Sequence, residues 1–331
     1  MDFLIADANK KDLCFLDDGT SLDFDIGSED DFQISVPLTD YDETVHTSGN
    51  ILYCIGTEYG GVLDDPEIST KDNKITFTGD TFRGMMKKKY IEPPEGEDYR
   101  IINGEANECI KSLIQMAFTS TIFSVSSLDT GAEIKNFRFD RYCSLLDGLI
   151  KMLASVNQRL IIKAIRTKDD FSIELSSKPI VDYSQDIEFS QDNNINFKIK
   201  KVTNKYNYMI ALGKGELHKR QVLYFRCDAG GAVTQVSTIP KGDNVKVYLY
   251  DNTSTEDFAA DAVKKFAEIN AADEYSMTMK DGIELEIGDV VGGRDYITGL
   301  TIAQPITRKI IKYNNNKKQS ISYEIGGGSN A

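Results

Sequence analysis

The sequence contains no tryptophan and only two histidines, His46 and His218. Zinc and iron–sulfur sites need closely spaced cysteines and histidines, and no two cysteines stand in a CxxC pair, so the sequence predicts no metal site. Most of the cysteines have apolar neighbours, which predicts buried free thiols, with a disulfide or a reactive nucleophile as the alternatives. The five are Cys14, Cys54, Cys109, Cys143 and Cys227.

Positive charge and long apolar runs are also scarce. Lys and Arg number 38 against 52 Asp and Glu, a formal net charge of -14, which disfavours a general binder of nucleic-acid phosphates. No window approaches the roughly 18 consecutive apolar residues of a membrane span. The apolar run at the N-terminus is too short for a signal peptide, so we expect folding in a cytoplasm. At 331 residues and 40% hydrophobic, the chain can build two or three domain cores.

No catalytic signature is present. The sequence has neither a nucleophile elbow nor a phosphate-binding loop, and Gly213-Lys214-Gly215 lacks the rest of a dinucleotide fingerprint. His218 has no Ser or Cys motif to act on, and His46, in a Thr-rich loop, is predicted to be exposed. The carboxylate clusters are typical of solvated turns and strand faces; they are Glu29–Asp31, Asp64–Glu67, Glu95–Asp98 and Glu284 with Glu286. We therefore predict a protein that is not an enzyme, with no catalytic residue and no cofactor.

Residues 1–95 are predicted to form a first β-barrel-like domain without helices. Apolar and polar residues alternate through Ser21–Ile26 and again from Phe32 to Val36, which is the period of a half-buried strand. A hairpin is expected between Val62–Thr70 and Lys74–Thr78, and Gly60-Gly61 is predicted to mark a turn or bulge. Pro93-Pro94 closes the domain, because proline cannot donate to a ladder.

The remaining chain divides into three further parts. Residues 96–180 are predicted to be an α+β insert, because Glu105–Phe118 and a segment after Asp140, its expected N-cap, carry apolar stripes of helical period. Residues 181–326 are expected to form a second β domain with a helical insertion at about 253–272, and residues 327–331 a flexible tail. The predicted fold class is thus α+β, mainly β, with two small β-barrel-like domains joined by α+β inserts.

Arg83 and Lys87–Lys89 form the one concentrated basic cluster of the sequence. Phe82, Met85 and Met86 are expected to pack inward while these four side chains stay charged at the surface. Such a cluster can be a solvated face or can bind nucleic acid. We favour contact with an acidic neighbouring subunit, since a chain this acidic offers complementary surfaces on its own copies.

Three segments resemble the baseplate hub and tail-associated proteins of bacteriophage tails and related tail-like bacteriocins. They are SLDFDIGSEDDFQISV, the block YCIGTEYGGVLDD with ITFTGDTFRGMMKKKYIEPPEGE, and LEIGDVVGGRDYITGLTIAQPITRKIIKYNNNKKQSISYEIG. The resemblance is to the N-terminal hub region of siphophage and contractile-tail families. It implies two β-barrel-like domains in one chain, and three copies arranged as a ring with pseudo-sixfold symmetry.

The resemblance also implies a place and partners in a virion tail made in a bacterial host. A homotrimer would adapt a sixfold tail tube to a threefold tip or spike, in contact with tube, distal tail and baseplate proteins. DNA would pass through without being specifically bound. Many such proteins carry a C-terminal hydrolase or receptor-binding region, which we expect on a separate chain here. The alternatives are a cell-wall hydrolase and a host-glycan-binding tail protein, although the lack of tryptophan disfavours a sugar-stacking platform.

Overall fold

The computed structural model describes residues 1–17, 19–69, 71–119, 122–167, 171–184, 195–200, 206–228, 231–252, 257–271, 274–279, 285–294, 301–313 and 319–326. Contacts divide the chain into two compact units: Met1–Ile195 with Thr278–Tyr323, and Asn196–Met277 with Glu324–Ala331. The predicted boundaries after residues 95 and 180 both fall inside the first unit, so the four-part division stays a prediction.

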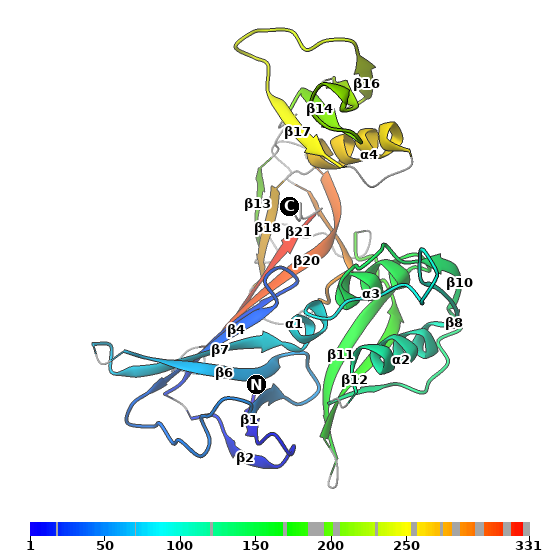
Figure 1. Cartoon of the computed structure of the whole chain (residues 1–331). Coiled ribbons are helices and arrows are strands. Elements are labelled where there is room, and N and C mark those ends of the chain that lie inside the picture. The colour runs from blue at the N-terminus through cyan, green and yellow to red at the C-terminus, as the bar shows by residue number, and fades with distance from the viewer. Residues whose placement is uncertain are drawn as a thin grey trace. The chain divides into compact units, whose positions relative to one another are not determined.

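A large antiparallel sheet forms the body of the first unit, in the strand order β21-β20-β3-β4-β7-β6-β5-β1-β2, with β19 paired to β20 (Figure 1). Because Ile311 of β20 lies opposite Phe24 of β3, the sheet joins segments from the two ends of the chain. The strands are β1 (Phe3–Ala6), β2 (Asp12–Phe15), β3 (Ser21–Ile26), β4 (Asp31–Pro37), β5 (Ile51–Cys54), β6 (Gly60–Ser69), β7 (Lys74–Thr81), β19 (Val290–Arg294), β20 (Thr301–Tyr313) and β21 (Gln319–Ile325).

Alternation sets the buried face of this sheet, as the sequence predicts. In β3, Leu22, Phe24 and Ile26 are buried while the residues between them are not, and Phe24 stacks on Phe32 of β4 with ring centroids 5.4 Å apart. The predicted hairpin of β6 and β7 is confirmed, with Ile68 opposite Ile75.

Gly60 and Gly61 do not form a turn, contrary to the prediction. Both lie in β6 between β5 and β7, and the irregularity in the β6–β7 register falls between Leu63 and Pro66. A Cβ added at Gly61 would lie 2.1 Å from the Asp80 carbonyl oxygen. The glycine is therefore explained by close backbone approach within the sheet.

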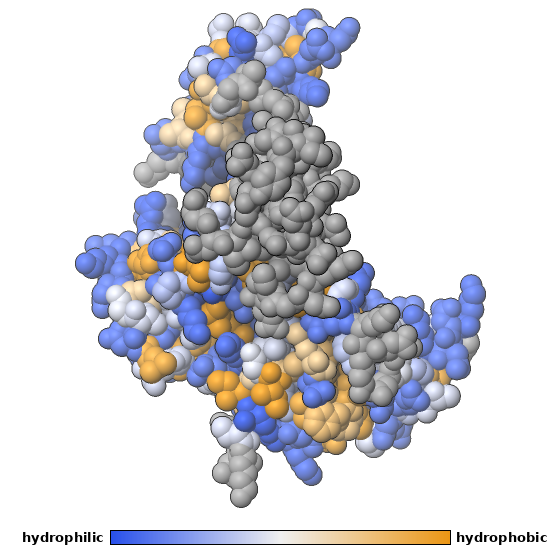
Figure 2. Space-filling view, turned by 180° about the vertical axis from the view of Figure 1, so that it is seen from behind, coloured by the Kyte–Doolittle hydropathy of each residue, from blue (hydrophilic) through white to orange (hydrophobic). Residues whose placement is uncertain are grey.

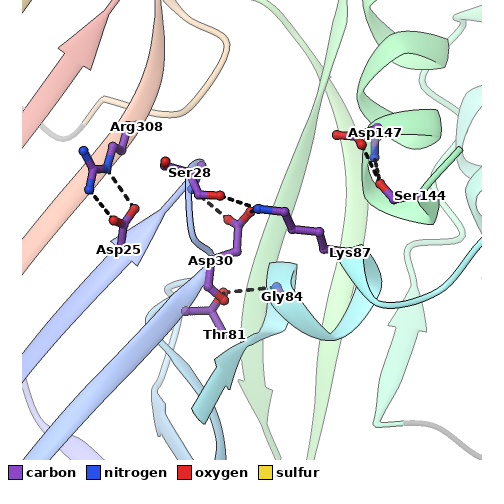
Figure 3. A network of polar contacts seen from close by, with 10 residues as sticks. Asp25, Ser28, Asp30, Thr81, Gly84, Lys87, Ser144, Asp147 and Arg308 are labelled. Atoms are coloured by element: carbon purple, nitrogen blue, oxygen red, sulfur yellow. Dashed lines mark hydrogen bonds and ion pairs between the residues drawn. The ribbon is translucent and has the colours of Figure 1, made fainter. Parts of the chain in front are cut away.

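The first 95 residues are not free of helix. α1 (Phe82–Lys87) follows β7 directly, with Thr81 as its N-cap. The Thr81 hydroxyl accepts a hydrogen bond from the Gly84 N–H at 3.2 Å and donates to the Asp30 carbonyl at 2.8 Å (Figure 3). The helix is so close to the loop between β3 and β4 that a Cβ at Gly84 would lie 2.2 Å from the Asp30 carbonyl oxygen. The cap and the glycine together hold α1 against the β3–β4 loop.

Helices and short sheets complete the first unit. They are β8 (Ile101–Glu105) with β10 (Glu133–Arg138), β9 (Phe123–Val125) with β12 (Phe171–Pro179) and β11 (Gln158–Arg166), α2 (Ala106–Ala117) and α3 (Leu145–Ala154). Both predicted helices form here, and their apolar stripes pack into one cluster that includes Ile110, Leu113 and Leu149.

Asp140 does not cap α3, contrary to the prediction. The N-cap is Ser144, whose hydroxyl accepts from the Asp147 N–H at 3.1 Å and donates to the Asp147 carboxylate at 2.7 Å (Figure 3). The Ser144 hydroxyl thus satisfies one of the orphan N–H groups in the first turn of the helix. Asp140 instead pairs with Lys151 at 2.7 Å on the surface.

The second unit contains a four-stranded sheet in the order β16-β15-β14-β17. Its elements are β14 (Tyr208–Leu212), a 3-10 turn (Leu217–Lys219), β15 (Val222–Cys227), β16 (Val233–Val236), β17 (Val247–Asp251) and α4 (Phe258–Ala271). Two further strands, β13 (Ile195–Lys200) and β18 (Glu274–Met279), pair with each other and are not part of this four-stranded sheet. Phe258 and Phe266 of α4 pack on Met209 and Phe225, so the predicted helical insertion is present. Its predicted start, at residues 253–256, lies outside the described residues.

The protein is mainly β with few helices. In the described part of the chain the strand orders are linear, and no sheet closes into a barrel. The description as two β-barrel-like domains therefore stays a prediction.

The corrected cap of α3 can be tested by substitution. Ser144→Ala should lower the free energy of unfolding by about 1 kcal/mol, because the orphan N–H of Asp147 loses its acceptor. Asp140→Ala is the matched control and should cost less than about 0.5 kcal/mol, because its pair with Lys151 is exposed. Urea unfolding followed by circular dichroism gives both values. Equal losses would contradict the assignment.

Candidate functional site

The predicted basic cluster lies on α1 and on the segment that follows it. The structure separates the four cations into different environments. Arg83 is buried, with 3% of its surface exposed, whereas the Lys88 side chain is 67% exposed. The expectation that all four are surface charges is therefore wrong for Arg83, which points into the unit.

Arg83 belongs to a chain of four charges of alternating sign. Its Nε donates to Glu58 Oε2 at 2.7 Å. Lys309 Nζ lies 3.3 Å from the other Glu58 oxygen and 2.7 Å from Glu286 Oε2. The side chains of Arg83, Glu58 and Lys309 are each 5% exposed or less, and that of Glu286 is 35% exposed. We call Glu58, Arg83, Glu286 and Lys309 the buried charge network.

The network favours the charged forms of Glu58, Arg83 and Lys309 although burial opposes them. Burial alone would raise the pKa of Glu58, but Arg83 and Lys309 outweigh that effect and lower it. Burial likewise works to lower the pKa of Lys309, and the negative charge of Glu58 reverses this, so the pKa is raised. A buried charge is tolerated only when it is paired and hydrogen-bonded. The three buried members of the network therefore depend on their partners.

Lys87 is turned toward the loop between β3 and β4 (Figure 3). Its ammonium donates to the Ser28 carbonyl oxygen and lies 3.4 Å from the Asp30 carboxylate. Asp30 is 3% exposed and has a positive φ of 61°, and its carboxylate accepts from the Gly27 N–H at 2.7 Å. Burial is the main cause that raises the pKa of Asp30. Lys87 thus serves mainly to hold this loop.

Lys88 and Lys89 are the members of the cluster that face solvent. Lys88 Nζ lies 2.6 Å from the Asp80 carboxylate, and the Lys89 ammonium lies 5.2 Å from the centre of the Phe118 ring. Lys89 also lines a pocket of about 460 Å³ together with Tyr90, Leu113 and Met116. Tyr90 is 62% and Met116 48% exposed. Cations beside exposed apolar side chains can bind a protein partner through both charge and apolar contact.

The five cysteines lie in environments that do not favour a reactive thiolate. Cys54, Cys109 and Cys227 are buried and Cys14 and Cys143 partly exposed, all as free thiols, which confirms the prediction for the first three. Burial raises the pKa of each, for Cys109 to about 11, so the reactive thiolate form is disfavoured.

His46 is buried rather than exposed, contrary to the prediction. It is 4% exposed, and its Nδ1 accepts from the Asp42 N–H at 3.2 Å. Burial lowers its pKa, so the neutral ring is favoured. Within the residues that the structure describes, no group of three or more His, Cys, Asp or Glu side chains is arranged to hold a metal ion.

None of the described helices is both long and apolar enough to span a membrane. No protein-family model and no curated protein matches the sequence.

Solved structures with the same fold exist at low sequence identity. The 43 kDa tail protein of prophage MuSo2 from Shewanella oneidensis is 11% identical and superposes with a TM-score of 0.56 over 98% of this chain and 98% of that chain. The prophage tail protein gp18 from Listeria monocytogenes EGD-e is 12% identical, with a TM-score of 0.50 over 99% of this chain and 96% of that chain. The fold is that of phage tail proteins. The resemblance found in the sequence is thus confirmed for the fold.

In this phage tail fold, sequence reasoning identified Arg83 but missed its partners. Glu58 is 25 positions from Arg83 and 251 positions from Lys309 in the sequence. No local pattern connects residues that are so far apart. One signal in the sequence pointed to a buried partner for Lys309. In β20, Lys309 shares the alternation of Ile311 and Tyr313, which face the core, so a lysine at that position required a buried partner.

Removal of the central carboxylate tests the buried charge network. Glu58→Gln should lower the free energy of unfolding by about 3–5 kcal/mol, because Arg83 and Lys309 would remain buried without their shared counter-charge. Asp23→Asn is the matched control. Asp23 pairs with Lys312 at 3.1 Å with both side chains about half exposed or more, and its loss should cost less than about 1 kcal/mol. Urea unfolding measures both. A loss for Glu58→Gln as small as the control would contradict the network.

Proposed function

We propose that this protein is a structural subunit of the baseplate or tail tip of a phage or phage-like tail. The observation that carries the proposal is the match of nearly the whole chain to nearly the whole of two prophage tail proteins, over 98–99% of this chain. Fold alone does not define function. The proposal gains support from the exposed charged and apolar side chains around Lys89, which suit contact with another protein.

More specifically, we propose that the protein is the hub of the tail. Three copies form a ring that adapts a sixfold tail tube to a threefold tip or spike and frames the channel for DNA, in the virion tail. The net charge of -14 favours passage without sticking, because acidic walls repel phosphates. Tube, distal tail and spike proteins are the partners in this proposal.

The surface of the first unit suits repeated protein contacts. Figure 2 shows apolar patches, in orange, between hydrophilic areas in the lower half of the view. Large apolar side chains are well exposed in this unit, among them Phe15 at 64%, Ile101 at 55% and Leu128 at 74%. Apolar patches bordered by polar residues are typical of interaction sites.

The competing functions are a cell-wall hydrolase and a glycan-binding tail protein. A zymogram with peptidoglycan separates the hydrolase from the hub, because a hub leaves no clearing zone. Binding of the isolated chain to host glycans would favour the glycan-binding function over the hub.

Lys88 and Lys89 are the proposed contacts with an acidic neighbouring subunit. The double substitution Lys88→Glu and Lys89→Glu should leave the subunit folded, because both side chains are exposed and such surface pairs contribute little to stability. Incorporation into tail particles should fall at least about tenfold, because like charges would meet at the contact. Immunoblots of purified particles measure incorporation, with circular dichroism as the test of folding.

Lys111→Glu is the matched control for this experiment. Lys111 lies on α2 and forms an ion pair with Glu108 at 3.3 Å, one turn away, so its reversal should leave incorporation unchanged. Normal incorporation of the double variant would reject these lysines as contacts, without bearing on the tail role itself.

A further inference from the structure

The four-stranded sheet of the second unit carries apolar side chains on both faces. One face is covered, since Met209, Ala211 and Phe225 are buried with α4. The residues that alternate with them point to the opposite face, which we call the outer face. In a sheet with one solvated face, that face is normally polar. Here it consists largely of Tyr208, Ile210, Leu212, Val222, Tyr224, Val236, Val247 and Leu249.

Strand register arranges these residues in rows. Leu249 of β17 lies opposite Ile210 of β14, which lies opposite Tyr224 of β15, which lies opposite Val236 of β16. A single apolar row therefore crosses all four strands. Directly opposite side chains on one face of a sheet are in contact range. The outer face is thus a contiguous apolar surface rather than a set of scattered residues.

Part of this surface is open to solvent. Leu249 is 59% exposed, Val247 39% and Val222 38%. Scattered exposed apolar residues need no explanation, but a contiguous patch marks an interaction site. The other residues named for this face are half-buried, and in the described part of the chain α4 packs on the opposite face.

Two charges flank the apolar row on opposite sides. Arg226 of β15 lies two residues beyond Tyr224 and opposite Tyr208, and Asp251 of β17 lies two residues beyond Leu249 and opposite Leu212. Because β15 and β17 are the two neighbours of β14, these charges are displaced equally from Ile210 in opposite directions. Asp251 pairs with Arg220, yet its side chain is still 56% exposed. A carboxylate can accept from a second guanidinium.

We propose that the outer face packs against the outer face of a second copy of this chain. A twofold axis that runs parallel to the sheet above Ile210, perpendicular to the line from Arg226 to Asp251, exchanges the two charged positions. Each Arg226 then faces the partner's Asp251, and the apolar rows meet between them. An isologous contact needs a self-complementary patch of this kind. The proposal does not depend on the tail function, since it rests on this sheet alone.

The size of the face limits the strength of the contact. Four strands and five residues per strand cover about 19 by 17 Å. That is well below the roughly 800 Å² per partner of a standard stable interface. Association through this face alone is therefore weak and concentration-dependent, and it becomes effective when copies are held near one another.

Sedimentation velocity of the full chain, over concentrations up to several hundred micromolar, tests this proposal. The wild-type protein should shift reversibly toward twice its starting mass, from monomer to dimer or, if a ring of three already exists, from trimer to hexamer. Leu249→Lys should raise the dissociation constant of this step at least about tenfold, because a charge would be buried in the apolar row. Arg226→Glu should also weaken the step, and Arg226→Lys should largely preserve it.

Leu217→Lys is the matched control. Leu217 lies in the 3-10 turn of the same unit and is 90% exposed, so the same chemical change there should leave the step unchanged. Circular dichroism confirms that each variant is folded. The proposal is overturned if the wild-type mass does not double at any concentration, or if Leu249→Lys and Leu217→Lys behave alike. Loss of binding to a different tail protein by Leu249→Lys, without self-association of the wild type, would also overturn it.

Discussion

The first unit depends on the buried ion pairs that Glu58 forms with Arg83 and Lys309. The two Glu58 oxygens lie 2.7 and 3.3 Å from two buried cations, which come from α1 and from β20. Without Glu58, Arg83 would lose its buried carboxylate partner, and Lys309 would keep only its pair with the partly exposed Glu286. The carboxylate therefore joins a helix near residue 83 to a strand near residue 309, in addition to the ladder between β20 and β3. The ladder sets the register of these strands, and the buried charge network holds α1 against them.

The interior arrangement also determines which charges reach the surface. Arg83 is committed to Glu58, and Lys87 to the loop at Ser28 and Asp30. Lys88 and Lys89, which follow α1, remain accessible, and Lys89 lines the pocket at Tyr90 and Met116. Of the four basic residues, Arg83 is thus buried, Lys87 is partly exposed but bound to a loop, and Lys88 and Lys89 are exposed. The proposed assembly contact therefore includes two lysines where the sequence suggested four basic residues. The buried charge network holds α1, the helix that these two lysines follow.

The sequence predicts those features of the fold that depend on local periodicity. Strand alternation located β3, β4 and the β6–β7 hairpin, and the apolar stripe located α2. α1 escaped prediction because its six residues are too few for a helical period and include Gly84, a poor helix former. Asp140 was a reasonable cap by residue type, but the N-cap is Ser144, whose hydroxyl accepts from the Asp147 N–H. The burial of Arg83 and His46 could not be predicted, because their partners are supplied by distant segments or by tertiary packing.

Amide hydrogen exchange measured residue by residue is the most direct test that Glu58 couples α1 to the sheet. If the buried charge network joins them into one cooperative unit, the amide of Lys88, which donates to Gly84, opens with the same free energy as the ladder amides of β20 opposite β3. Rapid exchange in α1 while the β20 amides remain protected would contradict the account, because the helix would then open without disturbing Lys309.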